Sequence, residues 1–342
     1  MSTDHAPLRH LMPGWFATVM GWSGLALAWH RATPALGDMA AGISLVAGAI
    51  ALLVFALLAA ALLMRWQRHH AAVREDLQHP VRHAFFAAIP ISALLLITLA
   101  VAHFGPGVPG LGAMWLIASV AQFAVTLWVL SRWLRATATA GPAAWNWGGI
   151  TPALFIPIVG NVLAPLAGIP LGYGAWAAAQ FGLGLLFWPV VMVLVIVRFG
   201  QAGMLPERLL PTLFIFVAPP AVIGVAVLQF GAPAPLAWML WGMAAFLALW
   251  AATLTRRITD QPFGIPHWGM SFPLAALAVL SLRLSDTPEG RWLAVPSLAL
   301  LALASLVILG LTLATVRGLR AGTLLVPEGP PVIPIKTQMS AA

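Results

Sequence analysis

The chain has no cysteine and very little charge. The absence of cysteine excludes disulfide bonds, thiolate metal ligands and cysteine nucleophiles together. Only 8% of the 342 residues are charged and 61% are hydrophobic, whereas a soluble domain is about a quarter charged and about half apolar. A soluble core cannot hide this much apolar surface, and disorder requires the opposite composition. The composition therefore predicts an all-α integral membrane protein that crosses the lipid bilayer several times.

Long apolar runs predict ten spans joined by short loops, because one spanning helix needs about 20 apolar residues. No connecting segment is long enough to form a soluble domain. We expect an N-terminal tail at residues 1–11, a transmembrane domain at 12–316 and a Pro-rich C-terminal tail at 317–342. The ten predicted spans cover residues 12–30, 38–64, 82–104, 110–131, 146–166, 173–197, 209–230, 235–254, 265–284 and 293–316.

Positive charge is distributed unequally between the two sides of the predicted bundle. Of the 17 Lys and Arg residues, only Arg31, Arg283 and Arg291 lie on the side opposite the N-terminus. Since Lys and Arg are retained in the cytoplasm, we predict cytoplasmic termini and a location in the inner (plasma) membrane. The positive charge follows the orientation of the spans in the membrane and forms no stripe for nucleic acid, so we expect no nucleic-acid partner. The cations on the N-terminal side are Arg9, Arg65, Arg68, Arg74, Arg82, Arg132, Arg135, Arg198, Arg208, Arg256, Arg257, Arg317, Arg320 and Lys336.

Proline is concentrated in the odd-numbered predicted spans, while the second and fourth spans have none. A proline inside a helix kinks it and frees a carbonyl, which in a membrane must face protein or water. We therefore predict five helical hairpins around a central pore, with Pro-kinked odd helices inside and even helices facing lipid. Membrane helices also tolerate proline without forming a ring. The prolines of the odd spans are Pro13, Pro90, Pro152, Pro157, Pro165, Pro211, Pro219, Pro220, Pro266 and Pro273.

Acidic residues are absent from the predicted spans, since all nine lie in tails or loops. Intramembrane carboxylates are typical of proton relays and cation channels, so their absence argues against both. A neutral path of Gly, Pro, Ser, Thr and Phe with Asn161, entered from a basic face, suits a small inorganic anion. With few polar groups to replace bound water, weakly hydrated monovalent anions should pass most easily.

Four histidines cluster in the loop between the second and third predicted spans. Their spacing matches no compact set of metal ligands, and Pro80 interrupts any helix that would align them. We therefore predict a solvated basic loop and no metal. The four are His69, His70, His79 and His83.

Three other histidines lie near the ends of predicted spans. His30 and His103 are near the outer ends of spans one and three, and His267 is near the inner end of span nine. They are the nearest coupling groups if the protein is a proton-coupled carrier. The spans contain no nucleophile–base pair or metal constellation, so we predict neither enzyme activity nor a cofactor.

Five motifs in order along the chain resemble one known family. They are Pro13-Gly14-Trp15-Phe16 followed by Gly21 and Gly24, then His79-Pro80-Val81-Arg82, then Thr151-Pro152 through Pro157, Gly160 and Asn161, then Pro211-Thr212-Leu213-Phe214-Ile215 with Ala218-Pro219-Pro220, and Ser271-Phe272-Pro273-Leu274. Together they resemble the tellurite-resistance/dicarboxylate transporter family. That family includes bacterial TehA-type channels, plant SLAC-type anion channels and fungal malate and sulfite permeases. The resemblance runs through nearly all of residues 10–330.

The resemblance implies a homotrimer of ten-helix subunits in which a phenylalanine on the ninth helix plugs the pore. Phe272, beside Pro273, best matches that gate, and Gly14 matches a small pore-lining position on the first helix. Without the resemblance, the residue pattern favours an aromatic packed between inner helices at Phe272, because the chain has 16 phenylalanines. The remaining pore-lining candidates are Phe16, Phe86, Phe155, Asn161 and Phe216.

These observations together predict a passive, gated anion channel of the inner membrane with Phe272 as the gate and small inorganic anions as its partners. The alternative is a secondary carrier for a dicarboxylate, sulfite or a tellurium oxyanion, as the fungal relatives imply. Such a carrier requires alternating access and a coupling residue such as His30, His103 or His267.

Overall fold

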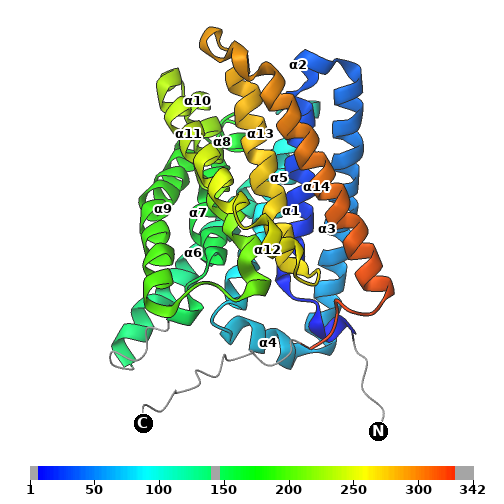
Figure 1. Ribbon diagram of the computed structural model, residues 1–342, viewed down its shortest axis with the longest axis vertical. Helices are drawn as coiled ribbons and strands as arrows, with labels where there is room; N and C mark the ends of the chain where they lie inside the picture. The colour runs from blue at the N-terminus through cyan, green and yellow to red at the C-terminus, as the bar shows by residue number, and fades with distance from the viewer. Residues whose placement is uncertain (1–6, 140–146, 328–342) are drawn as a thin grey trace, which may run out of the picture.

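The computed structural model describes residues 7–139 and 147–327, and every regular element of these residues is a helix (Figure 1). The long helices run between two ends of the molecule. The short helix α4 (His70–Gln78) lies across one end and α2 (Thr33–Leu36) lies at the other; we call these the α4 end and the α2 end. Parts of both predicted tails, residues 1–6 and 328–342, and the start of the fifth predicted span lie outside the described residues.

Eight helical segments of the described residues are long and apolar enough to cross a membrane, and each coincides with a predicted span. The predicted spans 12–30 and 146–166 correspond to shorter rods. The first is α1 (Ala17–Arg31), 15 residues long, preceded by the 3-10 turn η2 (Pro13–Phe16). The second is the apolar rod Pro152–Gly168. The eight are α3 (Asp38–Arg68), η3–α5 (Arg82–Phe104), α6 (Leu111–Thr139), α9 (Gly174–Ala202), η8–α10 (Glu207–Gln229), α11 (Ala234–Ala252), η9–α13 (Ile265–Ser285) and η10–α14 (Pro288–Arg320).

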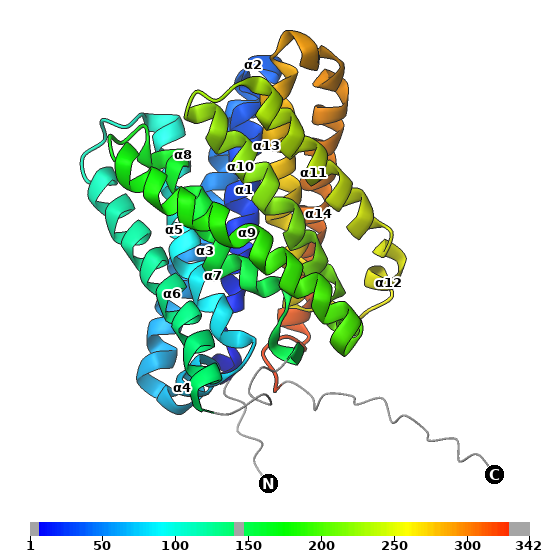
Figure 2. The same ribbon diagram turned by 90° about the vertical axis from the view of Figure 1, so that its left-hand side faces the viewer.

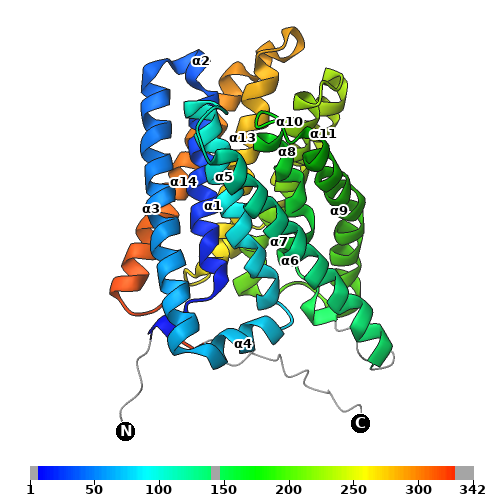
Figure 3. The same ribbon diagram turned by 180° about the vertical axis from the view of Figure 1, so that it is seen from behind.

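Burial divides these segments into an inner and an outer set. In the most apolar 18-residue window, 94% of η8–α10, 72% of η9–α13 and 61% of η3–α5 is buried, against 17% to 33% for α3, α6, α9, α11 and η10–α14. Both shorter rods are also largely buried. Figure 2 shows the outer helices α9 and α11 on one side of the bundle, and Figure 3, turned a further 90°, shows α3 and α6 on the adjacent side. The buried segments are odd-numbered predicted spans and the exposed ones even-numbered, whereas their closure into five hairpins around a pore stays a prediction.

Each inner rod begins with 3-10 turns. These are η2, η3 (Arg82–Ala87), η6 (Pro152–Leu154), η8 (Glu207–Val217) and η9 (Ile265–Met270). Proline occupies the first turn of η2, η6 and η9, where its missing N–H leaves no hydrogen bond unmade. The 11-residue η8 contains Pro211 and leads into α10 (Ala218–Gln229), which begins with two more prolines. In such turns each residue rotates by about 120° rather than the 100° of an α-helix, which changes the direction in which side chains point.

Helix α1 packs closely on α13 (Ser271–Ser285) through glycine. A Cβ atom at Gly21 would lie 2.5 Å from Oγ of Ser271, and one at Gly24 would lie 2.9 Å from Cδ2 of Phe272 and 3.1 Å from Cβ of Ala275. Small residues let two membrane helices approach until their backbones nearly touch. The position of Phe272 therefore depends on the absence of a side chain at Gly24.

Polar side chains of the outer helices support the broken rod Pro152–Gly168. The rod consists of η6, α7 (Phe155–Val159), η7 (Gly160–Leu163) and α8 (Ala164–Gly168). On α6, Gln122 Nε2 and Thr126 Oγ1 donate to the Pro157 carbonyl at 3.0 and 2.5 Å. Asn161 Nδ2 donates to Thr126 Oγ1 at 2.8 Å, and all these side chains are buried. Because a freed carbonyl in a membrane needs a protein donor, this network fixes the shape of the rod.

Candidate functional site

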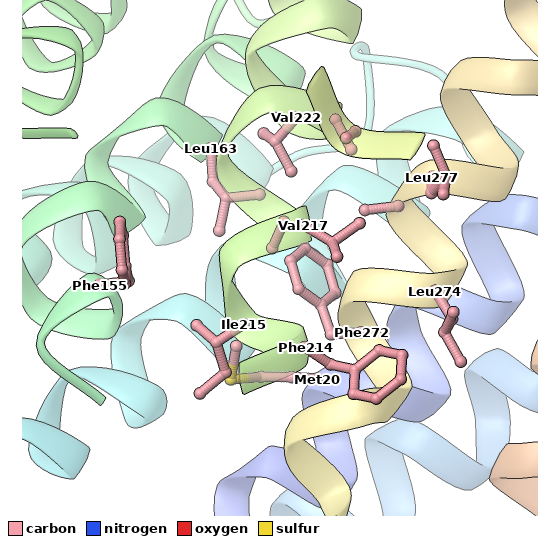
Figure 4. Packing of buried hydrophobic residues seen from close by; sticks show 14 of the residues in the cluster. Met20, Phe155, Leu163, Phe214, Ile215, Val217, Val222, Phe272, Leu274 and Leu277 are labelled. Atoms are coloured by element: carbon pink, nitrogen blue, oxygen red, sulfur yellow. The ribbon is translucent and has the colours of Figure 1, made fainter. Parts of the chain in front are cut away.

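Two cavities enter the inner layer from opposite ends of the molecule. The cavity at the α4 end has a volume of about 630 Å³ and the cavity at the α2 end about 390 Å³. Phe272 and Val222 line both of them. Figure 4 shows the ring of Phe272, a residue of α13, next to the η8–α10 segment. Leu274 and Leu277 lie on the same helix as Phe272, and Val217 and Val222 lie on the η8–α10 segment. Two side chains thus stand where the cavities meet.

The α4-end cavity has an apolar depth and a basic mouth. Gly14, Met20, Phe155 and Leu163 are among the residues that line its depth. The C-terminal segment 323–327 contributes four lining residues at the mouth: Thr323, Leu324, Val326 and Pro327. No carboxylate lines this cavity among the described residues, and its ionisable lining side chains are His10, His79, Arg82, Arg208 and His267.

An ion-pair cluster holds Arg82 at this mouth. Its guanidinium contacts Glu75 at 2.6 Å and Asp76 at 2.9 Å, and Asp76 also pairs with Arg65 at 2.7 Å. The side chains of Arg65 and Asp76 are 2% and 0% exposed. The hydrogen bond from Arg82 lowers the pKa of the Glu75 carboxyl. Arg208 forms no ion pair within the described part of the chain, so it contributes uncompensated positive charge to the mouth.

The α2-end cavity is apolar next to Phe272 and polar toward its rim. His30 and Arg31 of α1 and Arg283 of α13 line the rim, and no carboxylate of the described residues lines the cavity. Arg31 pairs with Asp286, whose side chain is 55% exposed. Both cavities therefore end in arginine and histidine, with an apolar zone between them.

Histidines near the two ends make separate local contacts. The rings of His30 and His103 meet edge to face with their centroids 4.6 Å apart. The Ser44 hydroxyl donates to the Ala26 carbonyl at 2.7 Å and lies 2.8 Å from Nε2 of His103, which therefore acts as the donor. At the α4 end, the backbone N–H of Gly264 donates to Nδ1 of His267 at 3.2 Å.

The histidines of the α4 loop bond to the backbone. Nδ1 of His79 accepts the N–H groups of Val81 and Arg82, both at 3.1 Å, and Nδ1 of His83 lies 2.8 Å from the His79 carbonyl oxygen. Within residues 7–139 and 147–327, no group of three or more His, Asp or Glu side chains is arranged to hold a metal ion.

Four of the candidate residues from the sequence lie at the cavities. Gly14, Phe155 and Pro273 line the α4-end cavity, and Phe272 lines both cavities. Phe272 is 8% exposed. The structure thus brings all four residues to the lining of the α4-end cavity, although their roles in transport stay predictions.

The other four candidates pack away from the cavities. The ring of Phe16 lies against Phe55 of α3, with centroids 5.6 Å apart, and that of Phe86 lies against Trp128 of α6 at 6.4 Å. Phe216 lies between Phe155 and Trp250, at 5.5 and 6.3 Å. Asn161 is taken up by the hydrogen bonds that support the broken rod.

Among the cavity-lining residues that the sequence analysis did not select, three bear on the predicted pore lining, on the gate and on the α2-end cavity. Phe85 lines the α4-end cavity in place of its neighbour Phe86, Val222 stands opposite Phe272, and Arg283 lines the α2-end cavity. The sequence could have indicated Arg283, because it lies 11 residues after Phe272. Eleven residues make about three helical turns, which places both side chains on the same face of the helix. Val222 had none, being one of many valines in apolar helices.

Comparison with known proteins agrees with this architecture. A family model described as voltage-dependent anion channel (SLAC1) matches residues 10–316. An uncharacterized transporter of Methanocaldococcus jannaschii is 25% identical over 300 residues, which cover 80% of this chain and 83% of that protein. The tellurite resistance protein TehA homolog of Haemophilus influenzae is 26% identical over 272 residues, covering 78% and 79%. The guard cell S-type anion channel SLAC1 of Arabidopsis thaliana is 23% identical over 296 residues, covering 84% of this chain but 51% of that channel.

The apolar helices and the opposed cavities define a multi-pass membrane protein of a transport family, not an enzyme. The chain belongs to the voltage-dependent anion channel (SLAC1) family. This confirms the resemblance found in the five sequence motifs. The chain spans about half the length of the Arabidopsis channel, so the regulated activity of that longer protein is not transferred to it.

Proposed function

We propose that this protein is a passive, gated anion channel selective for weakly hydrated monovalent anions. One observation carries the proposal: two cavities from opposite ends meet at Phe272 and Val222, and every ionisable side chain that lines them among residues 7–139 and 147–327 is Arg or His. A path without carboxylates and with cationic mouths attracts anions and repels cations. Its apolar middle offers little to replace bound water, so weakly hydrated anions cross at the smallest desolvation cost.

The proposed topology has ten spans in five hairpins around this path. The shorter rods, η2–α1 and Pro152–Gly168, count as spans because they lie among the inner helices, where neighbouring protein satisfies their freed carbonyls. The α4 end, which carries most of the Lys and Arg residues, faces the cytoplasm of the inner membrane by the positive-inside rule. The family resemblance further suggests a homotrimer, which the mass of the purified protein in detergent will test.

Phe272 is the proposed gate. Its ring is wedged between Gly24 of α1 and the η8–α10 wall and closes the two cavities to each other. An apolar constriction stops ions by excluding the water that must accompany them. Removal of the ring leaves a continuous, wetted path from one cavity to the other.

Anion current through the purified protein in planar bilayers tests the gate, with wild type beside Phe272→Ala under chloride and nitrate gradients. We expect large ohmic currents in the variant, with nitrate more permeant than chloride. Phe181→Ala is the matched control, because Phe181 is a buried aromatic of the outer helix α9 that packs on Phe230 and lines neither cavity. Equal currents in wild type and both variants would contradict the gate.

A secondary carrier is the second candidate, favoured by one observation. The His30–His103 contact with Ser44 at the α2 end is a titratable pair beside the α2-end cavity. A carrier should show saturable, pH-dependent uptake in liposomes that His103→Gln abolishes. Ohmic currents that are independent of His103 would exclude it. His70→Gln is the control substitution, because His70 is exposed on α4 and lines neither cavity.

A further inference from the structure

One face of α13 runs as a stripe from the Phe272 ring to the α2 end. Phe272, Ala276, Val279 and Arg283 follow one another at intervals of four, three and four residues, and all four line the α2-end cavity. This spacing keeps the side chains on one face of an α-helix. At about 1.5 Å per residue, Arg283 stands about 16 Å beyond Phe272 along the helix.

The facing helices repeat the same gradient. On α1 the cavity is lined by Gly24 and Leu27 and then by Arg31, and on α10 by Val222 and Val225 and then by Gln229. In each helix the residues nearest Phe272 are small or apolar and the residue farthest from it is polar. The cavity is therefore a funnel with an apolar stem and a polar rim.

Arg283 differs from the other half-buried and buried arginines around the cavities. Arg31, Arg65 and Arg82 each pair with a carboxylate. Arg283 forms no ion pair or hydrogen bond within residues 7–139 and 147–327, although its side chain is only partly exposed. A guanidinium that has lost part of its hydration gains from an anionic partner. Here the open space beside it is the funnel, so the partner that fits is a mobile anion.

We propose that the α2-end funnel contains an anion-binding subsite in which Arg283 is the principal ligand. The subsite takes small monovalent inorganic anions and prefers a planar oxyanion such as nitrate, because a guanidinium presents two parallel N–H donors that match two oxygens of one anion. His30 and Arg31 complete the positive rim, although Arg31 is partly neutralised by Asp286. This subsite deepens the proposed anion conduction: it concentrates anions on the far side of the Phe272 gate.

Direct binding is measured first, without any need for current. The purified full-length protein in detergent is heated at increasing nitrate concentration at constant ionic strength, with gluconate as the replacement anion. A ligand that binds the folded state raises the midpoint of unfolding. We expect nitrate to raise it in wild type and in Arg291→Gln, and to lose this effect in Arg283→Gln. Arg291 is the matched control because it is an exposed arginine after the same helix that does not line the funnel. Equal shifts in all three proteins, or no shift in wild type, would overturn the subsite.

Conductance in the Phe272→Ala background is measured next. Adding Arg283→Gln should lower nitrate current at low salt about fivefold, the loss of about one charge–charge interaction of 1 kcal/mol in water. At 1 M salt the difference should vanish, because the Debye length falls to about 3 Å. Arg283→Lys should restore the current but not the preference for nitrate over chloride, since an ammonium lacks the paired donors. Unchanged currents in Arg283→Gln at low salt would count against the subsite.

The two experiments separate the subsite from the channel. The subsite is rejected, and the channel is retained, if the Phe272→Ala variant conducts an ohmic current that Arg283→Gln does not change and if nitrate raises the unfolding midpoint equally with and without Arg283. A nitrate shift that requires Arg283, without current in any variant, keeps the subsite and rejects passive conduction in favour of a carrier.

Discussion

The inner helices and the outer helices of this protein are held in place by different contacts. The inner rods meet one another where side chains are missing, as at Gly21 and Gly24, and their irregular turns leave carbonyls such as that of Pro157 for other helices to bind. On the outer helix α14, by contrast, Ser305 and Thr312 donate to carbonyls of their own helix, and Ser305 also accepts from Trp29 of α1 at 3.1 Å. Most of the outer surface is apolar and exposed.

This difference teaches where shape is specified in a membrane bundle. Lipid is as apolar as leucine, so the hydrophobic effect alone places no inner helix against another. Close approach and cross-helix hydrogen bonds must do so, as at Gly21 and Gly24 and at the Pro157 carbonyl. Each prediction below therefore pairs an interior change with a peripheral counterpart of the same chemistry.

The largest difference is expected between two ion pairs at the α4 end. Asp76→Asn leaves the buried Arg65 without its carboxylate partner, and breaking such a pair costs about 3–5 kcal/mol of unfolding free energy. Glu207→Gln breaks the pair between Glu207 and Arg257, whose side chains are 46% and 49% exposed respectively. Because the pair is exposed, its loss should lower the unfolding free energy by about 1 kcal/mol at most. Unfolding in mixed micelles measures both. Similar losses in the two variants would remove the distinction between interior and surface charge.

Two glycine substitutions should change the free energy of unfolding in opposite directions. Gly24→Ala places a methyl group 2.9 Å from the Phe272 ring, and overpacking of this kind costs about 1–3 kcal/mol. Gly42→Ala on α3 meets no atom within 4 Å and gains up to about 1 kcal/mol from helix propensity. The same micelle assay measures the pair. If the gate proposal is correct, Gly24→Ala should also change the anion current while Gly42→Ala leaves it unaltered.

A smaller effect is expected from a threonine hydroxyl. Thr126→Val removes the donor to the Pro157 carbonyl and the acceptor for Asn161, and hydrogen bonds between membrane helices are worth about 1 kcal/mol. Thr312→Val removes only a bond to Ile308 of its own helix and should be nearly neutral. Equal changes in the unfolding free energy of the two variants would mean that the broken rod keeps its shape without the hydrogen bonds of Thr126.

The layering of the bundle could be predicted from the sequence because proline and charge report on it directly. Proline marks the helices whose carbonyls need protein partners, and arginine marks the ends. The eight long spans and the burial of the odd-numbered segments agree with that pattern. Which face of each inner helix lines a cavity could not be predicted in the same way.

The residue pair Phe85 and Phe86 shows the reason. Both lie in the 3-10 turn η3, where successive side chains point about 120° apart, and Phe85 lines the α4-end cavity while Phe86 does not. A position within the span does not determine which of the two faces the cavity. The prediction for Asn161 fails for a related reason: its rod changes from α-helix to 3-10 turn at Gly160, and the Asn161 amide bonds to the support network rather than lining the cavity. In the regular helix α13 the α-helical period holds, and there Phe272 predicts the face on which Arg283 lies.

The smallest expected effect is a pH dependence at the exposed edge of the same ion-pair cluster. The hydrogen bond from Arg82 lowers the pKa of Glu75 below its usual 4.5, and a lowered carboxyl pKa contributes stability that is present above pH 4.5 and is lost as the pH falls through the folded-state value. Because the Glu75 side chain is 63% exposed, solvent screening limits the contribution to a few tenths of a kcal/mol. Wild type should therefore exceed Glu75→Gln slightly in unfolding free energy at pH 6, and the two should converge near pH 3. Since Asp76 holds the buried half of the cluster in both proteins, a gap that stays constant or widens on acidification would contradict the lowered pKa of Glu75.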